Sequence, residues 1–492
     1  MNNANRWALW ATVIGSMGIG LLACSSDSLW IDEAWVGLLA SQKTLGSWWY
    51  SLREVSGSTL QMPLYAFYIW AWEKFAGHSE WALRAANIPW FCLSQCALVI
   101  ALRHRRHVRW IAPLLAAANP FLWFYLNEAR PYIMQYAAAA VVCSVLARTA
   151  EDASFGGRPA ALWILGGGLI VLSASSLLGV VWAAFAGVAW WYLVQGHLAK
   201  LRERKVLLPA AFCAISLLGL AGYYYWTIRI GARASATGRS GPWNVVYVAY
   251  ELLVLAGLGP GRLQIRDHGL TAFTDLRGVL VPLTSASALF VGLLVYAARI
   301  TPKNQYRRAA IAGCVYAIPP AMLLFALGFM HNFRVLGRHF TPFLPIIIGL
   351  FTVAVANVWF RSRRLGIAFF SALIVFWLTS SFSLRFGERH RKDDYRGAAF
   401  TAREALSQGH QIWWAADLGG ARYYGLPVTP STVAFTPVLN ASTEALTKLP
   451  PPDMVISSKA DLYDANGALA AYLAAGKFQV VRKLPAFTIW QR

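Results

Sequence analysis

Two adjacent carboxylates, Asp32 and Glu33, follow the first long apolar segment of the chain. They lie in the sequence Leu29-Trp-Ile-Asp-Glu-Ala-Trp35, between tryptophan side chains. Tryptophan favours the membrane–water interface, and acidic residues at the edge of a membrane are costly unless they have a function. A carboxylate in such a place can act as a general base. The alternative is a solvated helix N-terminus, where the helix dipole favours negative charge.

A second acidic motif, Asn127-Glu-Ala-Arg-Pro-Tyr132, combines a carboxylate with a guanidinium. Glu128 and Arg130 flank a bend that Pro131 enforces. A structural ion pair between the two side chains is an equally good interpretation of this motif.

Further charged groups lie in Arg338-His339 and in His78-Ser-Glu-Trp-Ala-Leu-Arg84. Each has a structural alternative, since such residues also anchor helix ends at a membrane surface. We expect all of these motifs on one face of the membrane. The planar fork of an arginine matches a phosphate, and a carboxylate can accept a proton. An anionic lipid-phosphate donor that meets a hydroxyl or amine acceptor needs both groups.

The segments that must position these residues are apolar. Of the 492 residues, 57% are hydrophobic and 13% are charged, whereas soluble proteins average about 45–50% apolar and roughly 25% charged residues. The net charge of +22 does not indicate nucleic-acid binding, because Lys and Arg gather between apolar runs, as in cytoplasmic loops. These basic clusters lie at 103–109, 200–205, 303–308 and 361–364.

We predict an α-helical multi-pass membrane protein with about eleven transmembrane spans, each near the roughly 20 residues that cross a bilayer. With the N-terminus in the cytoplasm, every basic cluster falls on the cytoplasmic side of a bacterial inner membrane. The predicted spans are 7–27, 86–102, 110–127, 131–149, 160–176, 178–195, 206–226, 278–298, 309–329, 341–360 and 365–384.

Two domains are expected. A transmembrane domain, residues 1–384, carries periplasmic loops at 28–85 and 227–277, and residues 385–492 form a small periplasmic α/β domain. The first loop contains an aromatic segment, Pro63–Phe75, which is shorter than a span and favours a helix lying in the interface.

Shorter elements are expected outside the spans. The second loop contains one short apolar helix, Val245–Leu258. In the C-terminal domain, amphipathic segments alternate with β-like runs, which is typical of α/β structure. The amphipathic segments are Tyr395–Leu406 and Ala468–Ala475, and the β-like runs are Gln411–Trp414, Asp453–Ser457 and Phe478–Val481.

The order of the motifs is similar to that of a family of membrane enzymes. After Asp-Glu come Pro63-Leu-Tyr65, Gly77-His-Ser-Glu-Trp-Ala-Leu-Arg84, Glu128-Ala-Arg-Pro-Tyr132 and Arg338-His-Phe-Thr-Pro342, within residues 1–360. This order resembles the GT-C membrane glycosyltransferases, specifically glycosyltransferase family 39. That family includes protein O-mannosyltransferases and the bacterial aminoarabinose transferase for lipid A.

The resemblance implies a GT-C-like fold, a polyprenyl-phosphate sugar as donor, an inverting transfer of a hexose or pentose, and an acidic base in the first external loop. Asp32 matches that base, with Glu33 as the alternative. Glu128 matches a second acidic motif, which in relatives contacts the acceptor or a metal, and Arg130 and Arg338 match arginines that contact phosphate. The matching motifs add Tyr132, Arg84, Tyr65 and His339 to the substrate-binding residues.

Parts of the family pattern are absent. The chain has Gln61-Met-Pro-Leu-Tyr65 where many relatives have His-Pro-Pro-Leu-Tyr, so a donor contact differs. The sequence leaves open whether a divalent metal is bound, and no motif identifies the acceptor as a lipid, a glycan or a protein. The expected partners are therefore the lipid-linked donor, membrane lipids and a periplasmic acceptor, without nucleic acid.

Two other functions fit a multi-pass protein. A transporter or flippase generally carries ionisable residues near the bilayer midplane, whereas here the predicted spans hold their charges at the ends. A polysaccharide polymerase or ligase also has many spans and external arginines. The transferase chemistry is simpler, because a phosphate monoester with a second pKa near 6 leaves readily and needs only a base and a cation.

The predicted topology can be tested with alkaline phosphatase fusions, because this reporter is active only in the periplasm. Fusions are expected to be active after Ser58, Gly241 and Gly409 and silent after Arg106, Arg204 and Lys303. Activity of the fusion at Arg204 would contradict the assignment, since the positive-inside rule places that cluster in the cytoplasm.

Overall fold

The computed structural model describes residues 3–54, 57–102, 108–196, 204–230, 242–252, 257–269, 271–274, 277–302, 306–331, 334–427 and 434–492. Parts of the predicted basic clusters and of the loop 227–277 lie outside these residues, as do the fusion positions Arg106, Gly241 and Lys303.

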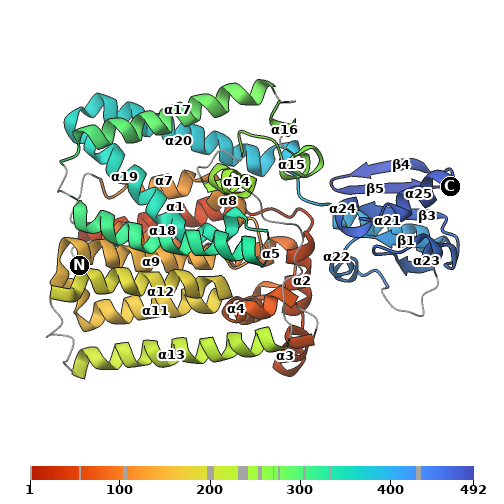
Figure 1. Ribbon diagram of the computed structural model, residues 1–492, viewed down its shortest axis with the longest axis horizontal. Coiled ribbons are helices and arrows are strands. Elements are labelled where there is room, and N and C mark those ends of the chain that lie inside the picture. The colour runs from red at the N-terminus through yellow and green to blue at the C-terminus, as the bar shows by residue number, and fades with distance from the viewer. Residues whose placement is uncertain are drawn as a thin grey trace. The chain divides into compact units, whose positions relative to one another are not determined.

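The chain forms two structural units (Figure 1). The first, here called the helical unit, comprises Met1–Cys24, Leu52–Tyr68 and Arg84–His390. The second, here called the sheet unit, comprises Ser25–Ser51, Ile69–Leu83 and Arg391–Arg492. The predicted loop 28–85 is thus divided between the two units, and the C-terminal part joins the residues that follow the first helix.

Long apolar helices dominate the helical unit. They are α1 (Asn3–Ala23), α6 (Ile88–Ala101), α9 (Tyr132–Glu151), α11 (Pro159–Ser175), α12 (Leu177–Val194), α13 (Arg204–Arg229), α17 (Arg277–Ile300), α18 (Arg307–Met330), α19 (Leu344–Arg361) and α20 (Arg363–Phe386). Among the described residues, nine helical segments are long and apolar enough to cross a membrane, and Pro159–Ser175 is a shorter apolar helix. The chain is a multi-pass membrane protein.

Each of the eleven predicted spans falls on a helix, but one of them is broken. Residues 110–127 form two short helices, α7 (Ile111–Ala118) and α8 (Pro120–Leu126). The break lies at Asn119, whose side chain accepts a hydrogen bond from the backbone N–H of Leu122 at 3.1 Å, followed by Pro120 at the first helical position. Asparagine and proline favour these positions of a helix start. The number of membrane crossings stays a prediction.

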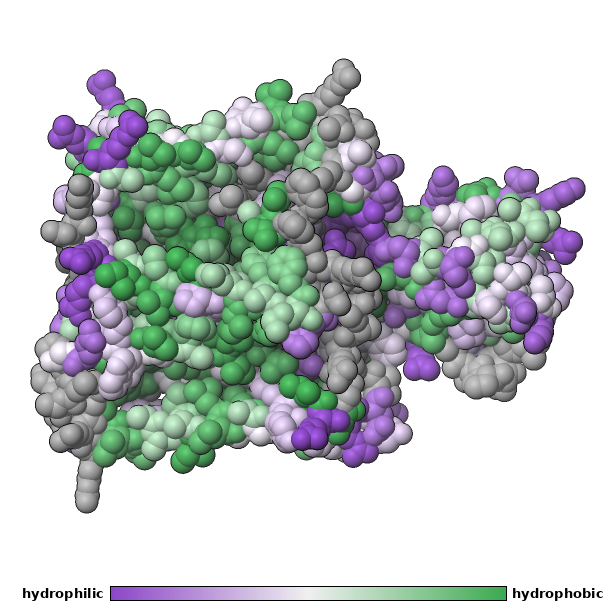
Figure 2. All heavy atoms as spheres, in the orientation of Figure 1, coloured by the Kyte–Doolittle hydropathy of each residue, from purple (hydrophilic) through white to green (hydrophobic). Residues whose placement is uncertain are grey.

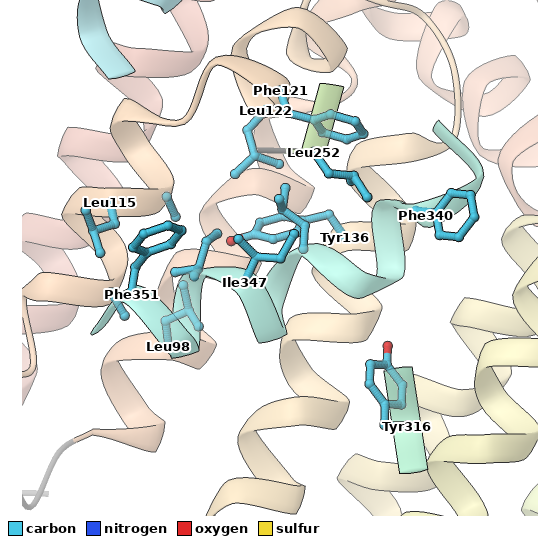
Figure 3. Packing of buried hydrophobic residues seen from close by; sticks show 14 of the residues in the cluster. Leu98, Leu115, Phe121, Leu122, Tyr136, Leu252, Tyr316, Phe340, Ile347 and Phe351 are labelled. Carbon is cyan, nitrogen blue, oxygen red and sulfur yellow. The ribbon is translucent and has the colours of Figure 1, made fainter. Parts of the chain in front are cut away.

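Side chains from helices far apart in the sequence fill the core of the helical unit. Figure 3 shows Leu98 of α6, Leu115 of α7 and Phe351 of α19 packed together, with Tyr136 of α9 close by. The outer surface of the same helices is also apolar: Leu350 of α19, for example, is 53% exposed. The visible helix surfaces in Figure 2 are mostly hydrophobic, and hydrophilic side chains gather toward their ends. Such a surface suits contact with lipid.

Shorter helices connect the long ones. They are α10 (Ala153–Gly156), α14 (Pro242–Leu252), α15 (Arg262–His268), α16 (Thr271–Thr274) and the 3₁₀ helices η1 (Gly57–Gln61), η3 (Gly337–Phe343) and η4 (Glu388–His390). The predicted turn near Ser173–Ser176 is present, and the Ser176 side chain caps α12. The expected helix Val245–Leu258 corresponds to α14.

Three helices of the first loop include residues of both units: α3 (Leu45–Glu54), α4 (Pro63–Ala76) and α5 (Glu80–Ala85). The aromatic segment Pro63–Phe75 forms α4, as predicted.

The sheet unit contains a five-stranded sheet in the order β2-β1-β3-β5-β4. Strand β1 (Ile412–Ala415) is parallel to β2 (Phe435–Pro437) and β3 (Met454–Ser458), whereas β5 (Phe487–Gln491) is antiparallel to β3 and to β4 (Gln479–Leu484). The helices of this unit are α2 (Ile31–Ala40), α21 (Tyr395–Ser407), α22 (Leu418–Tyr423), α23 (Thr443–Thr447), α24 (Ala460–Tyr463) and α25 (Ala468–Ala475).

Helices cover both faces of the sheet. Trp414 packs on one face with Tyr395 of α21, and its neighbour Trp413 packs on the other with Leu469 of α25. All four residues of β1 are buried, as expected for a parallel strand that is covered twice. The predicted α/β domain is confirmed, while β2, which has only three residues, and β5 were not predicted.

Candidate active site

In the sheet unit, Asp32 and Glu33 lie in the first turn of α2. The helix begins just after Trp30, whose backbone N–H donates to Glu33 Oε2 at 3.5 Å. A carboxylate at this position satisfies an N–H group that has no partner within the helix. The backbone of the motif thus forms a helix N-terminus, as the structural alternative states. The two side chains, however, differ sharply in their surroundings.

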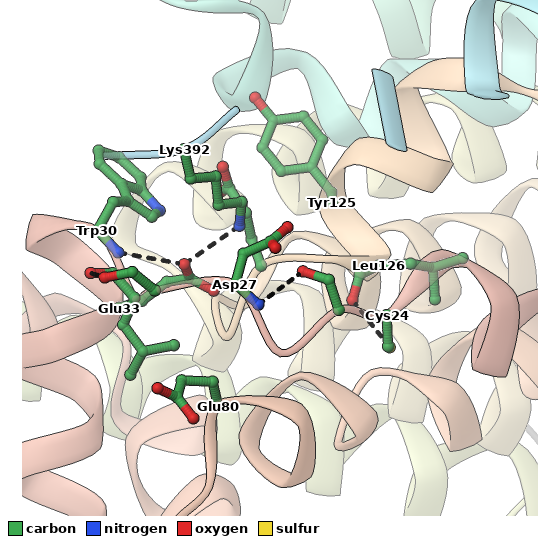
Figure 4. A network of polar contacts seen from close by, with 12 residues as sticks. Cys24, Asp27, Trp30, Glu33, Glu80, Tyr125, Leu126 and Lys392 are labelled. Carbon is green, nitrogen blue, oxygen red and sulfur yellow. Dashed lines mark hydrogen bonds and ion pairs between the residues drawn. The ribbon is translucent and has the colours of Figure 1, made fainter. Parts of the chain in front are cut away.

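The Glu33 side chain is completely buried and forms an ion pair with Lys392. Lys392 Nζ lies 3.1 Å from Glu33 Oε2, and the Lys392 side chain is only 10% exposed. Figure 4 shows this pair together with the contact from Trp30. A buried carboxylate requires such a partner, because burial without one is strongly unfavourable. Asp32, by contrast, is half-buried.

In the helical unit, the second acidic motif forms the turn between α8 and α9. Asn87 holds this turn: its side-chain Nδ2 lies 3.2 Å from the carbonyl of Tyr125, 3.3 Å from that of Leu126 and 2.5 Å from that of Glu128. Asn87 is fully buried, and Glu128 is 1% exposed. One amide thus fixes the backbone from which the Glu128 side chain projects.

Glu128 forms an ion pair with Arg262, the first residue of α15. Arg262 Nη1 lies 3.8 Å from Glu128 Oε1, and Nη2 lies 3.0 Å from Glu251 Oε1. Nη2 also donates to the Tyr125 hydroxyl at 3.2 Å, and the guanidinium carbon lies 3.8 Å from the centre of the Phe124 ring. Two carboxylates and an aromatic face therefore fix this guanidinium in one orientation.

Arg262 nevertheless remains accessible, since its side chain is 41% exposed. A guanidinium has several N–H donors in a planar fork. Within the described part of the chain, only Nη2 donates hydrogen bonds. An oriented, partly exposed guanidinium with unused donors is suited to bind an anion.

Local sequence explains how Glu251 reaches this site. Val248, Glu251 and Leu252 lie on one face of α14, and all three are buried. Glu251 Oε2 accepts a hydrogen bond from the backbone N–H of Gly337 at 2.8 Å. A Cβ atom at Gly337 would lie 2.3 Å from Glu251 Oε2, so this approach requires glycine.

Glycines also place Arg262. In Gly257-Leu-Gly-Pro-Gly261, a Cβ atom at Gly261 would lie 1.8 Å from the carbonyl oxygen of Arg389, and one at Gly259 would lie 1.5 Å from the Tyr250 hydroxyl. The chain therefore packs against η4 and α14 directly before Arg262.

More positive charge lies on η3 and η4. Arg338 follows Gly337, and its guanidinium carbon lies 6.0 Å from the centre of the Tyr132 ring. Arg389 donates to the carbonyl of Gly257 at 3.2 Å and to His390 Nε2 at 3.2 Å. Burial and the charge of Arg389 lower the pKa of His390 to about 4, so this histidine is neutral near pH 7 and accepts that hydrogen bond.

The remaining predicted residues are buried in the helical unit. Arg130 is 2% exposed, and Arg84 and Tyr65 are fully buried. The backbone carbonyl of His339 accepts a hydrogen bond from Trp182 Nε1 at 3.2 Å, and its Nδ1 accepts one from the backbone of Leu336 at 3.3 Å. His339 thus stabilises η3 in addition to any role in binding.

The nine predicted residues are divided between the two units. Asp32 and Glu33 belong to the sheet unit. The helical unit contains Tyr65, Arg84, Glu128, Arg130, Tyr132, Arg338 and His339. Within the helical unit, Glu128 pairs with Arg262. The Tyr132 ring lies 4.7 Å from the Tyr125 ring, centre to centre, and also lies beside the Arg338 guanidinium.

Sequence reasoning missed Arg262, Glu251, Asn87 and Lys392. Glu251 carries a detectable signal, because it is the only charged residue of an otherwise apolar helix. The glycines before Arg262 are a weaker signal. Nothing in the sequence links Lys392 to Glu33, since the two are 359 positions apart.

A metal site was left open by the sequence. Within the described ranges, no three or more His, Cys, Asp or Glu side chains are grouped so that they could hold a metal ion.

Comparison with known proteins identifies the fold. No family model and no curated protein sequence matches the chain. The structure is similar to that of ArnT from Cupriavidus metallidurans in the apo state, with 14% sequence identity, a TM-score of 0.57, and coverage of 99% of this chain and 98% of that chain. It is similarly close to ArnT bound to undecaprenyl phosphate, with 13% identity, a TM-score of 0.56 and the same coverage. The predicted resemblance to GT-C enzymes is confirmed for the fold.

The Glu33–Lys392 pair leads to a stability prediction. We expect Lys392→Met to lower the free energy of unfolding of the sheet unit by about 3 kcal/mol, because it leaves a buried carboxylate without its cation. The double variant Lys392→Met/Glu33→Gln should recover most of this loss. The measurement is denaturant unfolding in detergent, followed by the fluorescence of the sheet-unit tryptophans.

Arg396→Met is the matched control, because Arg396 also lies 3.1 Å from a carboxylate, that of Glu80, but is 52% exposed. Exposed pairs contribute only about 0–1 kcal/mol. Equal losses for Lys392→Met and Arg396→Met would contradict the importance of burial.

Proposed function

We propose that this protein is an inverting glycosyltransferase of the bacterial inner membrane, which transfers a hexose or pentose from a polyprenyl-phosphate donor to a periplasmic acceptor. The observation that carries this proposal is the Arg262 guanidinium, which two buried carboxylates orient and which keeps unused donors on its exposed side. A phosphate matches such a fork.

The surroundings of Arg262 favour a phosphate that is linked to a lipid. Helix α14, which carries its partner Glu251, also exposes the apolar side chains of Val245 and Val246, on which a polyprenyl chain can lie. ArnT, which has the same fold, has been crystallised with undecaprenyl phosphate. Arg338 adds positive charge in the same unit, and Glu128 and Glu251 act by orienting Arg262.

We assign the base to Asp32. Glu33 is already engaged by Lys392 in a buried pair, which stabilises its charged form and removes it from solvent. Asp32 is half-buried. In the proposed reaction, the acceptor hydroxyl or amine attacks the anomeric carbon and the bond from that carbon to the phosphate oxygen breaks. The acceptor proton passes to Asp32, and the phosphate keeps the electron pair of the broken bond.

The remaining predicted residues receive roles in substrate binding. Arg130 is proposed to contribute charge toward the donor phosphate, and Tyr132 to support Arg338 through its ring. Arg84, Tyr65 and His339 of the same unit are proposed to contribute to substrate binding as well.

Donor binding provides the first test, because it requires neither the sugar nor the acceptor to be known. Purified protein in nanodiscs is expected to bind a synthetic short-chain polyprenyl phosphate, measured by native mass spectrometry or calorimetry. Arg262→Ala should weaken binding about tenfold to a hundredfold, since a hydrogen bond to a charged group contributes about 1.5–3 kcal/mol. Arg262→Lys should be intermediate, because lysine lacks the planar fork.

Arg299→Ala is the charge-matched control, since Arg299 is exposed at the end of α17. Unchanged binding in Arg262→Ala would contradict the phosphate-binding role. The proposed donor is lipid-linked, so robust transfer from a nucleotide sugar without a lipid carrier would contradict the mechanism.

Turnover provides the second test. Asp32→Asn keeps the shape of the side chain but cannot accept a proton, so we expect the rate of sugar transfer to fall by about 10²–10⁴ with normal expression. Arg130→Ala should impair use of the donor, and Arg130→Lys less so. If Asp32→Asn is active and Glu33→Gln is inactive, the base is Glu33. If both variants are active, neither residue is the base.

A further inference from the structure

The C-terminal residues 391–492 and the residues that follow α1 form one structural unit. This unit therefore includes Asp32, the base assigned above, together with a five-stranded sheet. The contacts between α2 and the C-terminal residues explain what the sheet contributes.

Two reciprocal contacts join α2 to α22. The ring of Tyr423 lies on Gly37, where an added Cβ atom would be 2.5 Å from the ring. The ring of Trp35 lies on Gly419 in the same way, and an added Cβ atom would again be 2.5 Å away. Each helix thus offers a glycine to an aromatic side chain of the other, which fixes their distance and rotation.

Asp417, at the start of α22, makes a polar contact with α2. Its Oδ2 accepts a hydrogen bond from Trp35 Nε1 at 3.4 Å, and its Oδ1 accepts from the backbone of Gly419 at 2.8 Å and of Gly420 at 3.3 Å. Burial raises the pKa of Asp417, and the negative charge of Asp32 raises it further. Asp417 therefore interacts electrostatically with the proposed base.

The chain before α2 is held as firmly. The backbone N–H of Leu29 donates to the Tyr424 hydroxyl at 2.8 Å, and the backbone N–H of Arg396 donates to Ser28 Oγ at 3.0 Å. Lys392 pairs with Glu33. The Asp32 turn is thus fixed from the chain before it, by its neighbour Glu33 and from the helix that follows.

These contacts lie at the edge of the sheet where the parallel strand β1 ends. Asp417 and α22 follow the carboxyl end of β1, which is parallel to β3. Open α/β sheets generally bind their ligands just beyond the carboxyl ends of parallel strands. Here α2 packs against the helix that starts at that edge.

We propose that the C-terminal α/β domain is an intramolecular positioning module, which uses the carboxyl edge of its sheet to hold the Asp32 helix. This inference rests on the proposed function for the role of Asp32, but not for the contacts. Asp417 is then a positioning residue that acts through α2, and the chemical step should depend on it more than donor binding does.

The test uses the full-length protein in nanodiscs and measures two quantities. The first is hydrogen exchange of the α2 backbone amides. The second is kcat and KM for a polyprenyl-phosphate sugar. The variants are Gly37→Ala, Gly419→Ala and Asp417→Asn. In Asp417→Asn, the amide oxygen can still cap α22. The amide nitrogen that replaces Oδ2 cannot accept the hydrogen bond from Trp35, and the side chain carries no charge.

The matched control is Gly46→Ala, because Gly46 lies in helix α3 of the same unit and its added Cβ atom would meet nothing closer than 3.9 Å. Alanine favours a helix more than glycine does. By helix propensity alone, Gly37→Ala would slow the exchange of the α2 amides. Faster exchange in this variant would therefore report the loss of the contact with Tyr423.

We expect Gly37→Ala and Gly419→Ala to speed exchange of the α2 amides about tenfold or more, as expected when local opening becomes easier. Both should lower kcat at least about tenfold while KM for the donor changes less than about twofold. Gly46→Ala should change neither quantity. Adding Tyr423→Ala to Gly37→Ala makes room for the methyl group and should return exchange toward the wild-type rate.

Asp417→Asn guards against loss of folding, because it adds no atom that could clash. It should lower kcat with an unchanged exchange pattern in the sheet strands. Unchanged α2 exchange in both glycine variants would overturn the inference, as would a change in donor KM without one in kcat. If the wild-type protein transfers no sugar, the proposed function fails, whereas the exchange measurements still decide whether the domain holds α2.

Discussion

A buried charge must have a partner, and this constraint organises both units of the protein. Glu33 is fully buried and is compensated by Lys392. Glu128 and Glu251 are nearly as buried, and both are compensated by Arg262. Lys392 and Glu33 are 359 positions apart, and Arg262 is likewise distant in the sequence from Glu128, so these two pairs form only when distant segments have come together. Removing one partner of such a pair is far more costly than removing an exposed pair.

Glycine is the second recurring device, because it allows backbones and charged groups to approach closely. Gly337 lets the Glu251 carboxylate reach a backbone N–H, and Gly261 lets the chain before Arg262 pack on η4. In the sheet unit, Gly37 and Gly419 each accommodate an aromatic ring. The positions of the Arg262 group and of the Asp32 helix therefore depend on these glycines as well as on the charged side chains themselves.

The two devices have a common consequence for function. A guanidinium that is fixed before the ligand arrives loses little conformational freedom on binding, and this preorganisation favours affinity. The same holds for a carboxylate on a helix that is fixed from several directions, because a base must be placed accurately to act. The protein thus combines an apolar helical unit, suited to a lipid chain, with polar groups that are rigidly held.

The sequence by itself determined the class of structure. Hydropathy and the basic clusters located a helix at each of the eleven predicted spans, and the alternation of residues 395–481 located two helices and three strands of the C-terminal domain. These features could be predicted because they depend on local periodicity and composition. The order of the motifs also indicated the fold that comparison with ArnT identifies.

Only the tertiary structure decided which residues act together. The sequence offered an ion pair of Glu128 with its near neighbour Arg130 as one interpretation, and the structure adds a pair with Arg262, which is distant in the sequence. Asp32 and Glu33 are adjacent and chemically alike in the sequence, yet one is half-buried and the other is fully buried against Lys392. The physical reason is that burial and ion pairing are set by segments far away along the chain, whose approach no local pattern records.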